Sequence, residues 1–182
     1  MKRTQRNLFI IMAAMVAFYS VVSRLPGMAA LAVLGAALIV IAVLAILARE
    51  YFASKRLMRR RQWQAAVEKL KKLEQKLLKA SWVRASSLLY LNVYTFDGVA
   101  LVRNQVAQCF MNLEDSDQAV RWLRSALLRD PHFAIPYVNL ALIAAQRKDE
   151  TNARREMSRA IQLGFNPATA SRLLRRALEE QR

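Results

Sequence analysis

A repeat with a period of 34 residues is the feature of this sequence that most restricts how the chain can fold. Shifting the sequence by 34 superimposes small residues on small ones and large apolar residues on large ones: Ala107 on Ala141, Asp115 on Asp149, Ala119 on Ala153, Leu123 on Met157 and Ala126 on Ala160. A repeat of this length is typically a hairpin of two helices that cannot bury its apolar face alone, so its copies stack on one another. We therefore expect a helical array with an extended binding surface.

Apolar spacing outside the repeat predicts three more helices. Residues 62–79 place apolar side chains at helical intervals with lysines on the opposite face, which is typical of an amphipathic helix. A second helix is expected over 82–96, and Asp97 with Gly98 ends it. Pro167 opens a more polar helix over 167–181, which we expect to cap the end of the array.

The residues that recur in both copies resemble the tetratricopeptide repeat family. The matching positions are Ala107, Phe110, Ala119, Leu123, Ala126 and Pro131 in the first copy, and Tyr137, Leu140, Ala141, Ala153, Met157 and Ala160 in the second. The resemblance covers 100–133 and 134–167. It implies two helical hairpins, 99–112 with 114–129 and 135–147 with 150–163. Arg103 departs from the pattern, because Tyr137 stands there in the next copy, and the repeat count stays open at two to three.

In this family the first helix of each copy lines a concave groove, so the resemblance implies where a partner would bind. The groove positions carried over are Leu101, Asn104, Gln108 and Met111 from the first copy, and Ile135, Val138, Leu142 and Ala145 from the second. Most are apolar and a few are amides, which favours an apolar peptide or a partner helix. The alternative is that the chain's own capping helix covers the second set. Trp122 lies outside the recurring positions, and either an interface or an ordinary contact between helices explains it.

Two apolar stretches precede the repeat region, and we expect both to cross a membrane as helices. Residues 28–48 are 21 residues without a charge, enough to span about 30 Å of hydrocarbon at about 1.5 Å per residue. The other stretch, over about 7–23, is shorter, and Pro26 with Gly27 suits a tight turn between the two. The alternative for 8–22 is a cleaved signal peptide, because basic residues precede it.

Most of the net charge of +16 flanks these stretches. Residues 1–61 contain ten Lys or Arg and one acid, Glu50, a charge of +9. Because cytoplasmic flanks carry the Lys and Arg excess, we expect both termini and the repeat domain to lie in the cytoplasm. General resemblance, not any single residue, implies a multi-pass protein of the bacterial inner membrane. Residues 49–61 are expected to form a basic stalk whose cations attract anionic lipid headgroups: Lys55, Arg56, Arg59, Arg60 and Arg61. A periplasmic repeat domain, with one stretch cleaved or not inserted, is the alternative.

Residue types that carry catalysis are sparse in this chain. His132 is the only histidine, Cys109 is the only cysteine, and the four glycines form no phosphate-binding loop. We therefore expect no enzyme activity, no metal site and no cofactor. A pI near 11.0 suggests nucleic-acid binding as a competing hypothesis. It is disfavoured because most of the excess charge flanks the apolar stretches and no nucleic-acid motif is present.

Together these patterns predict an all-α protein with a transmembrane helical hairpin in 1–48, a stalk over 49–61 and a short tetratricopeptide-like α-solenoid over 62–182. The expected function is that of a membrane-anchored scaffold or adaptor that binds other proteins and helps to assemble an inner-membrane complex. The resemblance suggests cell-envelope assembly or exopolysaccharide synthesis and export as the process, although a fold does not specify one. A basic membrane-surface or nucleic-acid-binding protein is the alternative. The partner's identity and self-association stay open.

Overall fold

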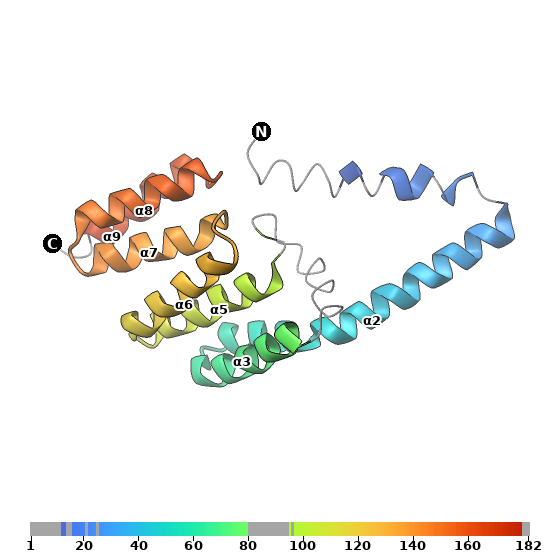
Figure 1. Ribbon diagram of the computed structural model, residues 1–182, viewed down its shortest axis with the longest axis horizontal. Helices are drawn as coiled ribbons and strands as arrows, with labels where there is room; N and C mark the ends of the chain where they lie inside the picture. Colours follow the sequence, from blue (N-terminus) through green and yellow to red (C-terminus); the bar gives the residue numbers. More distant parts are fainter. Residues whose placement is uncertain are drawn as a thin grey trace.

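The computed structural model describes residues 12–13, 16–20, 22–24, 26–79, 95 and 97–179, except for the side chains of 40, 41 and 43–48. Within these residues the elements are helices and no strand occurs, which confirms the all-α prediction. They are α2 (Gly27–Arg59), α3 (Trp63–Lys79), α5 (Gly98–Asn112), α6 (Ser116–Arg129), α7 (Ala134–Gln146), α8 (Glu150–Gln162) and α9 (Pro167–Glu179). Figure 1 shows α3 to α9 following one another in an elongated array, from which the first half of α2 projects.

Two helical hairpins, α5–α6 and α7–α8, reproduce the 34-residue period in space. Their second helices begin at Ser116 and Glu150, which are 34 residues apart. In both copies an aspartate precedes that helix, Asp115 or Asp149, and its carboxylate accepts a hydrogen bond at 3.0 Å from the backbone N–H three residues on. This cap satisfies one of the N–H groups that a helix start leaves unpaired. The same local chemistry therefore starts the same helix twice.

The turns between paired helices also repeat. Glu114 and Lys148 both have a φ of 61°, the left-handed conformation. In each turn the following N–H donates to the carbonyl five residues earlier, at 3.0 Å and 2.9 Å, which is the bond of a Schellman helix end. Gly164 (φ 105°) ends α8 and Arg61 (φ 58°) ends α2 with the same bond, at 3.0 Å in each case. Four helices thus end with the same left-handed residue and the same hydrogen bond.

Alanines at equivalent positions let the helices of each hairpin approach closely. Ala107 and Ala119 are fully buried in the first hairpin, and Ala141 and Ala153 are fully buried in the second. Larger side chains, such as the buried Leu123, fill the gaps between helices. The expected capping helix is α9, which packs its apolar residues on α7.

The second half of α2 belongs to the repeat domain and is not a stalk. Tyr51 and Ser54 are buried, and Leu57 and Met58 pack against the core that α3 and α5 form. α2 and α3 are antiparallel, because the chain reverses direction at residues 60–62. Lys76, near the end of α3, accordingly pairs with the carboxylate of Glu50 in α2. The stalk expected over 49–61 is therefore the first helix of an additional hairpin.

Two expected elements coincide only in part with what the structure describes. The helix expected over 82–96 lies outside the described residues except for residue 95. Of the span expected over 7–23, residues 12–13, 16–20, 22 and 23 are described, and all of these except residue 23, which is in a turn, are helical. Among the residues that the structure describes, no helix is long and apolar enough to cross a membrane.

Candidate partner-binding site

A cavity of about 620 Å³ lies along the first helices of three successive hairpins, and we call it the α2–α5 cavity. α2, α5 and α7 contribute most of its lining, and the first residue of α3 closes one end. The lining residues are Tyr51, Phe52, Lys55, Met58, Arg59, Trp63, Gln108, Met111, Asn112 and Asn139. The cavity thus occupies the surface that first helices share, where the sequence resemblance implies a groove.

Amides and a thioether form the α5 wall of the α2–α5 cavity. Gln108 and Met111 are half-buried and line the cavity, as expected for groove positions. Asn112 donates from its side chain to the Gln108 carbonyl oxygen at 2.7 Å. Asn139 reaches in from α7, where its side chain is 7% exposed. This wall therefore offers hydrogen-bonding groups beside an apolar surface.

Cations and aromatic rings form the α2 wall. The Lys55 ammonium donates to Gln105 Oε1 at 2.7 Å and lies 5.7 Å from the centre of the Tyr51 ring. Burial lowers the pKa of Lys55 below its ordinary value. Arg59 is exposed at the cavity, Phe52 is 51% exposed, and no acidic residue is among the described lining residues. This wall is consequently positive and apolar.

The cations expected to meet lipid headgroups do not form one cluster. Arg56, Arg59, Arg60 and Arg61 are exposed, in keeping with that expectation. Lys55 instead points into the repeat domain and is held there by Gln105. The reason is that the helix continues through this segment, so one of its faces packs on the core that α3 and α5 form.

Four of the expected groove residues are buried and expose almost no surface of their own. Leu101, Asn104, Val138 and Ala145 are between 0% and 5% exposed. Leu101 belongs to the core cluster that includes Tyr51 of α2, and Asn104 is bonded to another side chain. These positions are closed because helices on both sides of α5 and α7 cover them.

The capping helix covers the groove positions of the second copy, which was the alternative reading of the sequence. Val138 and Leu142 belong to one apolar cluster with Leu173 and Leu174 of α9. Ile135 is half-buried between this cluster and the α2–α3–α5 core. The part of the first-helix surface that stays open to a partner therefore lies beside α2 and not beside α9.

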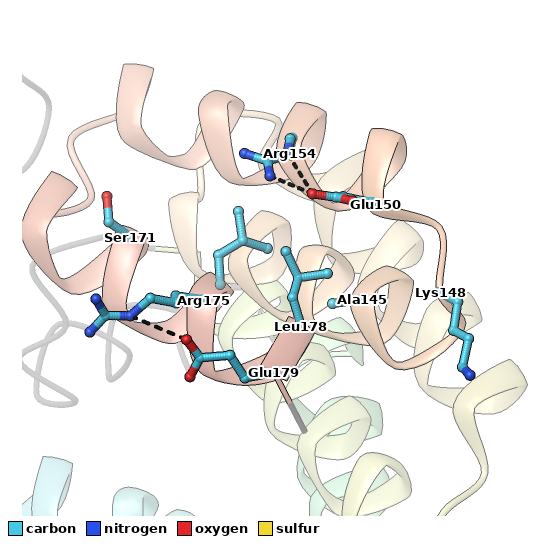
Figure 2. A pocket seen from close by; sticks show the side chains of 9 residues that line it. Ala145, Lys148, Glu150, Arg154, Ser171, Arg175, Leu178 and Glu179 are labelled. Atoms are coloured by element: carbon cyan, nitrogen blue, oxygen red, sulfur yellow. Dashed lines mark hydrogen bonds and ion pairs between the residues drawn. The ribbon is translucent and has the colours of Figure 1, made fainter. Parts of the chain in front are cut away.

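A second cavity, of about 570 Å³, separates α8 from the end of α9 (Figure 2). Its floor is apolar, with Ala145, Leu174 and Leu178. Its rim carries an Arg154–Glu150 pair on α8, and Arg175 lies 3.9 Å from Glu179 on α9. Each of these arginines faces a carboxylate on its own helix, and Lys148 adds one further positive charge to the lining. The positive excess of this cavity is therefore one charge, against two in the α2–α5 cavity.

Trp122 makes a contact between helices. Its ring is half-buried against the cores on both sides, and the Lys71 ammonium of α3 lies 5.8 Å from the ring centre. Beside it, Arg103 of α5 bonds to Glu74 of α3 at 2.6 Å and to the Ser125 carbonyl of α6 at 3.0 Å. Trp122 thus makes an ordinary contact between helices. It also lines a hollow of about 340 Å³ beside Gln118 and Arg121, so its role in an interface stays a prediction.

The single cysteine is inaccessible. Cys109 is 0% exposed, and burial raises the pKa of its thiol to about 11. The thiolate is the nucleophilic form of a cysteine, so this side chain is held in the unreactive form at neutral pH.

Sequence reasoning missed the α2 side of the cavity. Tyr51, Ser54 and Met58 recur at helical intervals, and this spacing could have revealed a core-facing stripe beneath the basic residues. Phe52 and Trp63 flank the same stripe, and an aromatic residue at such a place is a common interface signal. Asn139 could not have been found, because its place in the cavity depends on how α7 packs beside α5.

The α2–α5 cavity therefore combines two predicted groove residues with a wall that the sequence did not indicate. Neither a scan against models of protein families nor a search of curated proteins found a match for the chain.

Proposed function

We propose that the protein is a membrane-anchored adaptor of the tetratricopeptide type, whose repeat domain binds another protein and helps to assemble a complex at the bacterial inner membrane. In this proposal both termini and the repeat domain lie in the cytoplasm. Cell-envelope assembly, with exopolysaccharide synthesis or export as one case, is the process suggested by the sequence resemblance alone.

The α2–α5 cavity is the observation that supports a binding role most directly. It lies on the shared surface of first helices, and amides, aromatic rings and cations line it without an acid among the described residues. Partially exposed aromatic and arginine side chains around an apolar hollow are typical of protein interfaces. Phe52 and Trp63 would supply apolar contact area, and Gln108 would supply a hydrogen bond.

No helix among the described residues is long and apolar enough to cross a membrane, so the proposed anchor rests on the uncharged stretch of α2 and on its exposed side chains. α2 is one helix of 33 residues, and the 21 positions 28–48 within it carry no charge. Leu31, Leu38 and Ile39 are each 67% exposed, so no part of the chain that the structure describes buries these side chains. A lipid environment would remove these side chains from water, which is favourable by about 25 cal/mol per Å² of apolar surface buried.

Photocrosslinking in intact cells tests the binding role. Benzoylphenylalanine replaces Phe52, which it resembles in shape and which lines the cavity, or Leu128, which is 85% exposed on α6 away from the cavity. We expect a discrete protein adduct from position 52 and none from position 128. Equal adducts from both positions, or no protein adduct from position 52, would reject the cavity as the binding site.

Alkaline extraction of membranes tests the anchor. We expect the unchanged protein to stay in the membrane pellet and the double substitution Leu38→Arg with Ile39→Arg to release it, because two charges at the centre of a span oppose insertion. The matched control is Leu128→Arg, an equally polar change on α6. Release of the unchanged protein by alkali would reject the anchor.

A further inference from the structure

The α2–α5 cavity has the charge of a site for an acidic ligand. Lys55 and Arg59 are the ionisable residues of its lining apart from Tyr51, and the described lining contains no carboxylate to neutralise them. Arg59 makes no ion pair among the described residues and is exposed at the cavity. An acidic group that enters the cavity would therefore meet an available guanidinium.

The cavity also has a defined height above the proposed membrane, because α2 runs without a break from the uncharged stretch into the repeat domain. At about 1.5 Å per residue, Phe52 lies about 6 Å and Arg59 about 17 Å beyond residue 48 along this helix. The headgroup region adds only about 5–8 Å to each side of the hydrocarbon layer. Only the Phe52 end of the cavity would then lie among headgroups.

The length of the cavity along α2 favours a peptide over a single lipid headgroup. From Phe52 to Arg59 the helix rises about 10 Å, and Trp63 bounds the cavity at its far end. About three to four extended residues cover this distance at about 3.3 Å each. A peptide that leaves the membrane beside α2 would pass the aromatic ring of Phe52 first and would reach Arg59 with an acidic side chain.

We propose that the occupant of the α2–α5 cavity is the acidic juxtamembrane segment of another membrane protein. The continuous helix α2 holds the cavity at a fixed height above the membrane, where this segment would pass. This inference rests on the proposed function, since it needs both the anchor and a protein partner. It goes further by naming the partner's class, the position of the bound segment and the charge that Arg59 recognises.

Moving the cavity away from the membrane tests the proposal. Seven helix-forming residues inserted between Ala48 and Arg49 would raise the repeat domain by about 10 Å and turn it by only about 20°. We expect the protein adduct from benzoylphenylalanine at position 52 to fall at least tenfold, because the partner segment leaves the membrane at a fixed height. The matched control carries the same seven residues after Arg182, and its adduct should be unchanged. Benzoylphenylalanine at Gln108 is a second probe of the same cavity. It shows whether a loss of the adduct at position 52 reflects loss of the partner or a disturbance of that position alone.

Reversing the charge of the cavity is the second arm of the test. Arg59→Glu should reduce the same adduct at least tenfold, whereas Arg124→Glu, an exposed arginine on α6, should leave it unchanged. Loss in both arms supports the proposal. An adduct that survives the insertion would mean a partner that arrives from solution, and an adduct with lipid alone would mean a headgroup site; either result overturns it. No protein adduct in the unchanged chain would overturn the proposed binding role as well.

Discussion

Asn139 donates a hydrogen bond from Nδ2 to Oδ1 of Asn104 at 2.9 Å, and both side chains are buried between α5 and α7. This bond joins the first helices of two successive hairpins, next to the α2–α5 cavity that Asn139 also lines. A buried amide needs a partner, since leaving it unsatisfied costs about 1–3 kcal/mol. The pair therefore selects one register between the repeats.

Removing one side of this amide pair should destabilise the repeat domain. Asn104→Ala should lower the free energy of unfolding by about 1–3 kcal/mol, because it leaves the Asn139 amide without its partner. Urea unfolding of the full-length protein measures the change. In a double-mutant cycle, Asn139→Ala added to Asn104→Ala should cost less than Asn139→Ala alone. Fully additive effects would show that the two amides do not stabilise each other.

The ion pair between α3 and α5 should contribute more to the free energy of unfolding than an exposed pair of similar length. The side chains of Arg103 and Glu74 are only 20% and 10% exposed, and they lie 2.6 Å apart. Arg103→Ala should reduce the free energy of unfolding by roughly 2–4 kcal/mol, because it strands the Glu74 carboxylate and the Ser125 carbonyl. Asp117→Ala breaks the exposed 2.6 Å pair with Arg147 and should cost less than about 1 kcal/mol. Equal costs in chemical denaturation would contradict this ranking.

The left-handed turns predict stabilising substitutions. Glu114 and Lys148 hold a positive φ that side chains disfavour, so Glu114→Gly and Lys148→Gly should each stabilise the protein by up to about 1 kcal/mol. Gly164→Ala should destabilise it, since its φ of 105° is still less accessible to alanine. Thermal unfolding gives all three values. Ser158→Gly, within α8, is the control and should be destabilising. A loss of stability in both turn variants would refute the argument.

The buried thiol predicts a shifted pH profile for chemical modification. With a pKa of about 11 instead of 9.0, Cys109 has about 100-fold less thiolate at pH 8 than an ordinary cysteine, and it is also shielded from reagents. Alkylation of the folded protein should therefore be slow at pH 8 and accelerate as the pH rises toward 11. The comparison variant Cys109→Ala with Ser158→Cys carries an exposed thiol and should react with a midpoint near that of a free thiol. Similar rates in the two proteins at pH 8 would contradict the burial of Cys109.

The hairpins and their ends could be predicted from the sequence because they depend on neighbours in the chain. Asp115 and Asp149 cap the helices that follow them, and the paired alanines Ala119 and Ala153 are buried as their repetition indicated. The role of the basic segment before α3 was predicted wrongly. Its arginines dominate the composition, while Tyr51 and Ser54 on the other face of the helix are buried.

In the groove, too, the features set by neighbouring residues were predicted and those set by distant helices were not. Gln108 and Met111 line the α2–α5 cavity as their helix positions predicted, whereas Leu101 and Val138, on equivalent first helices, are buried. Their burial depends on α2 at one end of the array and α9 at the other, and neither helix is a neighbour in sequence.

The order of residues alone is enough to specify the helical class, the 34-residue hairpin and the caps, because helix periodicity and N–H satisfaction act over a few residues. Tertiary packing decides which side chains of the first helices stay accessible. Lys55 and Arg59 stand four residues apart on the same helix, yet one is held inside by Gln105 and the other is exposed. The physical reason is that accessibility is set by the surfaces that come to lie against a helix, and these surfaces come from distant parts of the chain.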